Sequence, residues 1–368
     1  MARIGVFTRP VDQRFSGSGF HLERLLLALA ERSHRHEIIL IHHESSDSPL
    51  YEVGFRDVMV RRNPFSIARL IDGMNFDLVH HNPLSIKVPV VGHSARQVAT
   101  VHSAEPMLIP ECYGIAQRLH YRFFVLNVLS RMDGLVTVSR TTAEYVAPRA
   151  GVSPESFTVI YNAADERFDD TSVSDERRRS LRKRYGVRTP FVLHVSRYSP
   201  RKNPGVLLRA FRRFLGDVDE PYQLVIAGSG WDNPDVRELV RRLDVEHSLR
   251  LLGFTPTEVI ADLYRMADLF LNATRAEGFG MPNVEAMQSG CPVVTTGAFA
   301  VPEVVGDGAV VVEDVDSPED LARAAVRVIS DQSLRTELVD RGRERAAQFS
   351  WADGAEKLLD VYERSLEA

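Results

Sequence analysis

Two acidic residues, Glu277 and Glu285, lie on either side of a glycine-containing loop in the stretch EGFGMPNVE. Gly278 and Gly280 allow the backbone to turn and to approach a ligand closely, and Pro282 suits the first turn of a helix. Free N–H groups at a helix start attract anions, and a carboxylate accepts two hydrogen bonds from a vicinal diol. The stretch therefore suits either a plain helix entrance or a site for a ligand with phosphates and sugar hydroxyls.

The plain helix entrance accounts for Glu285, whose carboxylate would complement the helix dipole about one turn inside the helix. It gives no reason for Glu277, which falls on the loop after a strand, or for Phe279, which we expect to be exposed. We therefore favour a binding site in which the two carboxylates accept hydrogen bonds from separate sets of hydroxyls.

A second loop, SRYSPRKNP, carries two cations, Arg197 and Lys202, ahead of a helix that we expect to begin at Pro204. Two cations beside a helix N-terminus suit a diphosphate, and they stabilise one whose negative charge grows as it leaves. Two solvated cations on a loop are the alternative. Taken with the acidic loop, the pair favours a nucleotide diphosphate sugar, whose ribose and hexose both carry vicinal diols.

The elements that position these loops form two series of short apolar runs that alternate with helical segments. This pattern is typical of parallel sheets with helices on both faces. We expect strands at 3–8, 37–41, 77–80, 97–102, 134–138 and 157–160, and then at 191–195, 223–227, 249–253, 268–272, 292–296 and 309–312. The fold class is therefore α/β, with two Rossmann-like doubly wound domains that face a central cleft.

The polar stretch 163–175 has no helical periodicity and no apolar run, so we place the domain boundary there. The predicted domains are 1–170 and 171–350, and the last helix, 351–368, is predicted to pack back on the first domain. The length of the chain favours two domains, because 368 residues exceed the size at which a single hydrophobic core keeps growing.

Composition bounds the function. The net charge of -5 gives no general attraction for nucleic acid. The basic run 177–188 reads as a solvated helix face between a Ser174 cap and Gly186. Cys112 and Cys291 are the only cysteines, which suits a reducing cytosol and excludes a disulfide framework.

Membrane contact is expected to be peripheral, in a cytoplasmic protein. The N-terminus lacks the features of a signal peptide, and the apolar stretch FFVLNVLS is too short to span a bilayer. In the helical segment 114–131, Arg118, Arg122 and Arg131 flank apolar residues, so the segment could contact a membrane and a lipid-linked acceptor. A buried crossover helix also explains it and is the favoured interpretation.

Two patterns of possible metal ligands are discounted. The pairs Asp217 with Asp219 and Asp314 with Asp316 are frequent by chance in an acid-rich chain, and His42, His43, His80 and His81 lack the spacing of a zinc site. We therefore expect no metal and no cofactor.

The first domain offers a glycine loop in FSGSGF, where Gly17 and Gly19 could approach a diphosphate after the first strand. A dinucleotide fingerprint would need a third glycine at Leu22 and an acid near His42, so NAD is disfavoured.

Several motifs resemble the second domain of retaining GT-B glycosyltransferases of the group-1 (family 4) type: SRYSPRKN, LVIAGSG, EGFGMPNVE and VPEVVGDG. The resemblance is close over residues 191–330 and looser in the first domain, where VATVHSAEP and TVIYNAADERF match. It implies an acceptor domain followed by a nucleotide-sugar donor domain.

The resemblance also implies residue roles. Glu277 would contact the transferred sugar and Glu285 the ribose, while Arg197 and Lys202 would bind the diphosphate. His102 in VATVHSAEP would lie near the donor sugar. The remaining donor-binding positions are Gly17, Gly19, Gly228, Phe254 in the base-binding loop, and the backbone of Phe279, Gly280 and Met281.

The implied reaction moves a hexose, such as mannose, glucose or an N-acetylhexosamine, from a UDP- or GDP-sugar to a hydroxyl of a glycan or lipid-linked acceptor. The departing diphosphate would help to deprotonate the acceptor on the same face of the sugar, so Glu277 would position rather than attack. A same-fold epimerase or hydrolase and a non-catalytic sugar-nucleotide sensor are the alternatives. The oligomeric state stays open.

Overall fold

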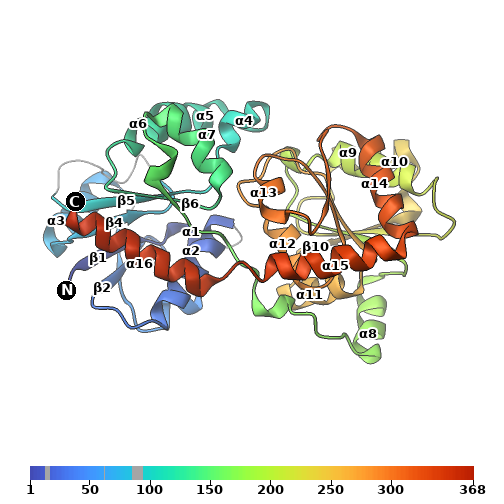
Figure 1. Cartoon of the computed structure of the whole chain (residues 1–368), viewed down its shortest axis with the longest axis horizontal. Coiled ribbons are helices and arrows are strands. Elements are labelled where there is room, and N and C mark those ends of the chain that lie inside the picture. The colour runs from blue at the N-terminus through green and yellow to red at the C-terminus, as the bar shows by residue number, and fades with distance from the viewer. Residues whose placement is uncertain (13–16, 62, 85–93) are drawn as a thin grey trace. The chain divides into compact units, whose positions relative to one another are not determined.

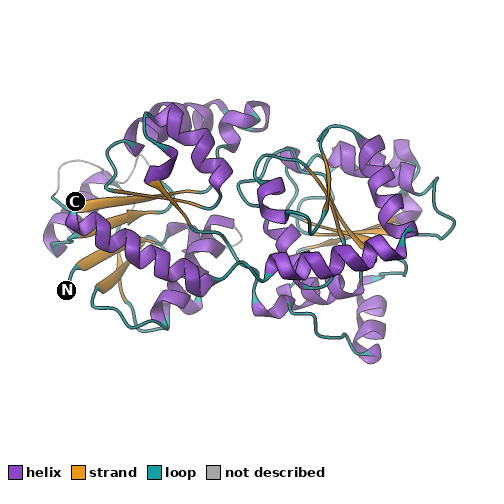
Figure 2. Ribbon diagram, viewed as in Figure 1, coloured by secondary structure: helices purple, strands orange, loops and turns teal. Residues whose placement is uncertain are grey.

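The computed structural model describes residues 1–12, 17–61, 63–84 and 94–368, so Phe15 and Ser16 of the FSGSGF loop lie outside the described residues. The chain divides into two compact units, which we treat separately. The first unit comprises Met1–Asn162 and Ser350–Ala368, and the second comprises Ala163–Phe349. In each unit, helices flank a parallel sheet (Figures 1 and 2).

The first unit holds a sheet of seven parallel strands in the order β3-β2-β1-β4-β5-β6-β7. Its strands are β1 (Arg3–Phe7), β2 (Glu37–His42), β3 (Arg56–Met59), β4 (Leu78–His81), β5 (Arg96–Val101), β6 (Gly134–Thr137) and β7 (Phe157–Val159). The strand β3 was not predicted, because its sequence RDVM is mostly exposed at the sheet edge and contains no apolar run. The order reverses between β1 and β4, which is where ligands bind in doubly wound folds.

In the first unit the C-terminal helix packs on a helix near the start of the chain. Apart from short 3₁₀ turns, the described residues of this unit form α1 (Arg9–Asp12), α2 (Gly17–Ala30), α3 (Pro64–Met74), α4 (Glu105–Leu108), α5 (Ile115–Leu119), a π-helical turn (His120–Val125), α6 (Leu126–Leu129), α7 (Arg140–Ala150) and α16 (Trp351–Glu367). The C-terminal helix α16 lies along α2 and reaches β5 and β6 (Figure 1). Leu358 and Val361 of α16 join the apolar core with Leu22 and Leu25 of α2.

The segment 114–131 differs from the buried crossover helix that we favoured from the sequence. It consists of α5, the π-helical turn and α6, and only its second half is buried, through residues such as Val125 and Leu129. In the first half Ile115, Leu119 and Phe123 are exposed by 70%, 49% and 63%. The apolar side chains of this segment therefore pack into the core near its C-terminal end and are exposed nearer its N-terminal end.

The second unit holds a sheet of six parallel strands in the order β10-β9-β8-β11-β12-β13. Its strands are β8 (Phe191–Val195), β9 (Gln223–Ala227), β10 (Leu249–Gly253), β11 (Leu269–Asn272), β12 (Val293–Thr296) and β13 (Val310–Val312). Its helices are α8 (Asp175–Tyr185), α9 (Pro204–Phe214), α10 (Pro234–Leu243), α11 (Thr257–Met266), α12 (Met281–Gln288), α13 (Val301–Val305), α14 (Pro318–Ser330) and α15 (Gln332–Ala346). Strand order reverses between β8 and β11.

The boundary between the units follows Asn162, whereas the sequence placed it at 170. Residues 163–170 belong to the second unit because a 3₁₀ turn, Glu166–Phe168, packs against α11 and α12. The ring of Phe168 meets Tyr264 edge-on at 5.9 Å, and Ser289 donates a hydrogen bond of 3.0 Å to the Phe168 carbonyl.

The basic run of α8 is a capped surface helix, as expected. Ser174 accepts a hydrogen bond from the backbone of Arg177, and Gly186 ends the helix in the left-handed region. Within the described residues, no helix is both long enough and apolar enough to cross a membrane.

Candidate functional site

The candidate site of the second unit forms where β8 and β11 end, at the reversal of strand order. The loop after β8 contains a 3₁₀ turn, Pro200–Lys202, followed by Asn203 in the left-handed region and Pro204 at the start of α9. The loop after β11 runs to Gly280. The backbone N–H of Arg275 donates a hydrogen bond of 2.8 Å to the carbonyl of Arg201, which joins the two loops.

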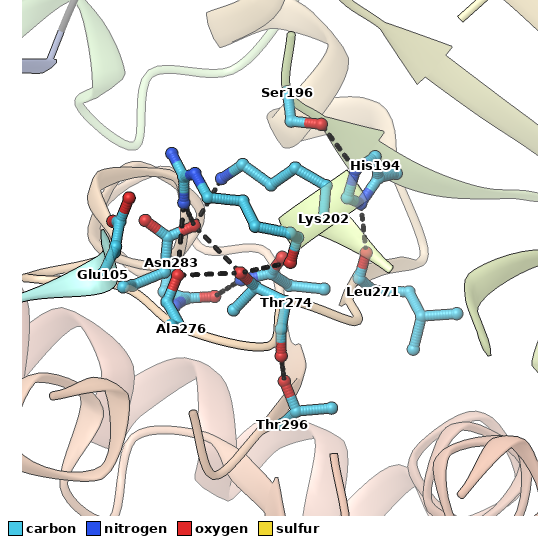
Figure 3. Close-up of polar contacts among 12 residues, drawn as sticks. Glu105, His194, Ser196, Lys202, Leu271, Thr274, Ala276, Asn283 and Thr296 are labelled. Carbon is cyan, nitrogen blue, oxygen red and sulfur yellow. Dashed lines mark hydrogen bonds and ion pairs between the residues drawn. The ribbon is translucent and has the colours of Figure 1, made fainter. Parts of the chain in front are cut away.

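Glu277 is the centre of this site. Its Oε1 atom contacts the guanidinium of Arg201 at 2.7 Å, forms an ion pair with Lys202 and accepts a hydrogen bond of 3.1 Å from Thr274. Figure 3 labels Lys202 and Thr274 among these partners. Burial acts to raise the pKa of Glu277, but the charges of Arg201 and Lys202 outweigh it and lower that pKa below its ordinary value. Glu277 is therefore a buried carboxylate that two cations hold in its ionised form.

The structure brings Lys202 and Glu277 together and adds a second cation, Arg201, to the contacts of Glu277. Arg197, which the sequence paired with Lys202, is exposed, and its side chain makes no hydrogen bond or ion pair within the described residues. A diphosphate contact by Arg197 stays a prediction, and the contact of Arg201 with Glu277 was not predicted. The available signal was the position of Arg201 beside Lys202 in a short turn that precedes a helix, where both side chains leave the same loop.

Gly228 has a structural reason to be glycine. Its φ is +137°, and a Cβ atom there would lie 1.9 Å from the carbonyl oxygen of Ser196. The loop after β9 can therefore approach the loop after β8, and the indole N–H of Trp231 donates a hydrogen bond of 2.9 Å to the same carbonyl. Gly228 shapes the strand ends that carry the site.

The helix α12 begins directly after Gly280, whose φ of +92° suits glycine. Met281 is its first residue, and the fully buried Asn283 lies in its first turn, where Oδ1 accepts a hydrogen bond of 3.1 Å from Asn272. The Nδ2 atom of Asn283 has no partner within the described residues. The positive end of this helix dipole follows Glu277 in the chain, and the cations of the neighbouring loop contact Glu277.

Glu285 is a different acid from Glu277. It is half-buried in α12 and accepts a hydrogen bond of 3.3 Å from the Tyr264 hydroxyl. Burial raises its pKa to about 7, because the one hydroxyl and the charge of Lys202 compensate only in part. The two acids flanking the glycine loop therefore differ in charge near neutral pH.

Phe279 is buried, with 4% of its surface exposed, so the expectation of an exposed ring was wrong. Its ring meets that of Phe349 edge-on at 5.4 Å, and the guanidinium of Arg345 lies over the Phe349 ring at 5.1 Å. The glycines on either side turn the backbone so that the side chain enters the core. Phe254, by contrast, is 64% exposed where β10 ends, and it offers a flat apolar face.

In the first unit, His102 lies where β5 ends and belongs to a neutral polar cluster. Its Nε2–H donates a hydrogen bond of 2.5 Å to Oδ1 of Asn82, and its ring meets that of His21 edge-on at 5.1 Å. Nδ1–H of His21 donates a bond of 2.7 Å to Asn162. Burial lowers the pKa of His102 well below its ordinary value, and the neighbouring histidines lower it further, so the ring is neutral.

The glycine positions of the first unit lie at the start of α2. Gly17 is exposed, and a Cβ atom added there would meet no other atom within 4 Å, whereas Gly19 is buried. Leu22 occupies the apolar core, where a dinucleotide fingerprint would require glycine.

Comparison with known families decides the identity. A family model described as Glycosyl transferases group 1 matches residues 177–345, and one described as Glycosyltransferase Family 4 matches residues 15–168. The chain is a group-1 glycosyltransferase. The first match contains Glu277 and the second contains His102.

Relatives of this glycosyltransferase include two mannosyltransferases of Escherichia coli. The O-antigen chain mannosyltransferase B is 27% identical, over 96% of this chain and 98% of that protein. The serotype-specific mannosyltransferase WbdA is 26% identical over 78% of this chain, and the match spans only 36% of WbdA. The crystal structure of HepE from Anabaena with UDP and glucose superposes with a TM-score of 0.80 at 20% identity, over 99% of this chain and 100% of that one. This likeness shows the GT-B fold.

Proposed function

We propose that this glycosyltransferase moves a hexose from a nucleotide diphosphate sugar to a hydroxyl of a glycan or lipid-linked acceptor, with retention of anomeric configuration. The observation that carries the proposal is the ionised Glu277 held by Arg201 and Lys202 beside the start of α12. A site with two cations, a helix N-terminus and a fixed carboxylate suits a ligand that joins a diphosphate to a polyol.

In the proposed reaction the bond between the anomeric carbon and the β-phosphate oxygen breaks, and the acceptor oxygen bonds to that carbon. The acceptor proton passes to the departing diphosphate on the same face of the sugar. Lys202, Arg201 and the N–H groups of α12 stabilise the charge that develops on the diphosphate, so we expect no metal ion to be required. Glu277 orients the sugar hydroxyls, because its two cations keep it ionised and hold it in place.

The names of the relatives support the substrate classes. Two relatives are called mannosyltransferases, one of them for the O-antigen chain, and HepE was solved with UDP and glucose. These names favour a plain hexose as the transferred group and a polysaccharide as the product. Phe254, exposed where β10 ends, would stack on the base of the nucleotide.

The deciding experiment separates transfer from the alternatives. UDP-glucose, UDP-N-acetylglucosamine and GDP-mannose are each incubated with the enzyme, with and without a panel of glycan and lipid-linked acceptors, in EDTA. We expect nucleoside diphosphate release that depends on acceptor, and a product whose anomeric carbon keeps the donor configuration by NMR. Release or rearrangement without acceptor would instead favour a hydrolase or epimerase, and binding without turnover would favour a sensor.

We also propose that the first unit contacts an anionic membrane surface through an apolar ridge formed by Ile115, Leu119 and Phe123. These residues are spaced four apart, so they lie one above another on successive helical turns. The exposed Arg118 and Arg122 lie between them, and residues 112–132 contain no Asp or Glu. Exposed apolar side chains flanked by cations suit the interface of an anionic bilayer, where a lipid-linked acceptor would lie.

Vesicle sedimentation tests this contact on the whole enzyme. We expect binding to vesicles that contain phosphatidylglycerol, little binding to pure phosphatidylcholine, and loss of binding in the double variant Leu119→Glu with Phe123→Glu. Phe65→Glu is the matched control, because Phe65 is 85% exposed on α3 of the same unit, outside the ridge. Equal binding by the ridge variant would contradict the contact. Cys112 and Cys291 are not joined in a disulfide, which suits the cytoplasmic face of such a membrane.

A further inference from the structure

Among the described residues, four other than glycine have a positive φ: Asn75, Asn203, Asp244 and Phe299. Asn75 and Asp244 end α3 and α10, and Asn203 precedes α9. Asn and Asp tolerate the left-handed region because their short polar side chains can bond to the local backbone, whereas a bulky aromatic residue there is an outlier. Phe299, with a φ of +56°, therefore needs a reason of its own.

Phe299 lies beside Glu277. It follows β12, and its backbone forms an isolated parallel bridge with that of Glu277. The next residue, Ala300, donates a backbone hydrogen bond of 3.3 Å to the Glu277 carbonyl. Backbones paired in this way are about 5 Å apart. The side chain of Phe299 is half-buried, and its backbone is paired with that of the residue whose carboxylate we assign to the transferred sugar.

Glycine would adopt this backbone conformation without strain, and the same loop does contain one. Gly297 lies two residues earlier, yet its φ is not positive. The loop thus has its glycine where none is required and an aromatic residue where glycine would be favoured. Strain of this kind is concentrated at ligand-binding sites, where the side chain is needed for its contacts.

We propose that Phe299 is a specificity-determining residue for the transferred sugar, and that its ring is an apolar wall beside Glu277 that favours an unsubstituted hexose over an N-acetylhexosamine. The proposal rests on the proposed function, because it requires a donor sugar at Glu277. Sugar sites combine a few fixed polar groups with apolar and aromatic walls. Glu277 supplies the polar contact, and the ring takes up the space that an N-acetyl group would need.

Calorimetric titration tests the proposal without knowledge of the acceptor. Phe299→Gly removes the ring and accepts the backbone conformation, and Phe299→Ala removes the ring but keeps the strain. Asp244→Gly is the matched control, because it also replaces a positive-φ residue in the second unit, at the end of α10 and away from Glu277. Each protein is titrated with UDP, UDP-glucose, UDP-N-acetylglucosamine, GDP and GDP-mannose.

In both Phe299 variants we expect the ratio of the affinity for the nucleotide hexose to the affinity for the free nucleotide to fall about tenfold. The ratio of the affinity for UDP-N-acetylglucosamine to that for UDP-glucose should rise by a similar factor. The affinity for the free nucleotide should not change, and Asp244→Gly should match the wild type throughout. A merely structural role would alter nucleotide and nucleotide sugar alike.

The result that overturns the proposal is a wild-type pattern of sugar preference in both Phe299 variants. That result leaves the proposed function intact, because the wild type would still bind nucleotide sugars. If the wild-type enzyme binds no nucleotide and no nucleotide sugar, the proposed function fails and this inference fails with it.

Discussion

Two buried polar groups at the ends of parallel strands, one in each unit, tolerate burial in opposite ways. In the second unit Glu277 keeps its charge because Arg201 and Lys202 contact it. In the first unit His102 gives up its charge because it is buried, and the neighbouring His21 and His80 add to the effect. A charged environment suits a diphosphate whose charge grows during the reaction, and a neutral one suits sugar hydroxyls.

The largest expected effect tests the charged half of this comparison. Lys202→Met keeps a long unbranched side chain and removes its charge, so under the proposed function the departing diphosphate loses one stabilising cation. We expect the rate constant for transfer to fall on the order of 100-fold to 1,000-fold, measured as acceptor-dependent diphosphate release. Arg237→Met is the control, since Arg237 forms an exposed ion pair with Asp232 in the same unit. A Lys202→Met enzyme with the wild-type rate would contradict the assigned role.

The next effect compares one glycine from each unit. Gly228→Ala places a Cβ atom 1.9 Å from the Ser196 carbonyl, whereas Gly17→Ala meets no atom within 4 Å. We expect Gly228→Ala to lower the free energy of unfolding of the second unit by about 3 kcal/mol. Gly17→Ala should change that of the first unit by less than about 0.5 kcal/mol. Chemical denaturation followed by circular dichroism measures both changes. If Gly228→Ala had the same free energy of unfolding as the wild type, the packing argument at Gly228 would be wrong.

The pH dependence of stability should also differ between the units. In the first unit burial lowers the pKa of His21 to about 4 and of His80 to about 3, and it lowers that of His102 as well. The unfolded chain binds protons to these histidines below about pH 6.5 while the folded unit does not. The stability of this unit is therefore fully present well above pH 6.5 and falls as the pH falls, by about 5 kcal/mol from pH 6.5 to pH 5 for the three histidines together.

The second unit should be nearly insensitive to pH over the same range. Burial lowers the pKa of His194 to about 4, which acts as in the first unit. Glu285 acts in the opposite sense, because its pKa is raised to about 7 and the folded unit keeps a proton that the unfolded chain loses above about pH 4.5. Hydrogen exchange with mass spectrometry reports each unit separately. A parallel decline of both units would show that Glu285 and His194 do not offset each other.

The smallest effect tests the neutral half of the comparison. Asn82→Asp puts a carboxylate against Nε2 of His102, so we expect the pKa of His102 to rise by about 1 to 2. NMR titration of the imidazole measures it. Gln97→Glu is the control in the same unit, because Gln97 contacts His81 at 2.8 Å instead. A His102 signal that titrates as in the wild type would contradict the hydrogen bond to Asn82.

Several features were readable from the sequence because they depend on local pattern. Every predicted strand is present, since buried parallel strands read as apolar runs, and the starts of α9 and α12 fall at or beside their prolines. The strand β3 was missed because an exposed edge strand carries no apolar signal. Lys202, Glu277 and Glu285 were chosen from residue type and spacing, and the structure places all three around the strand ends of one sheet.

The sequence by itself determined the α/β class, the order of the elements and the residues able to bind a diphosphate and a diol. Only the tertiary structure decided which of them act together. Arg201 rather than Arg197 contacts Glu277, Phe279 enters the core, and Phe299 stands strained beside the carboxylate. These outcomes depend on contacts between loops far apart in the chain, and on the burial that sets each charge, neither of which local spacing encodes.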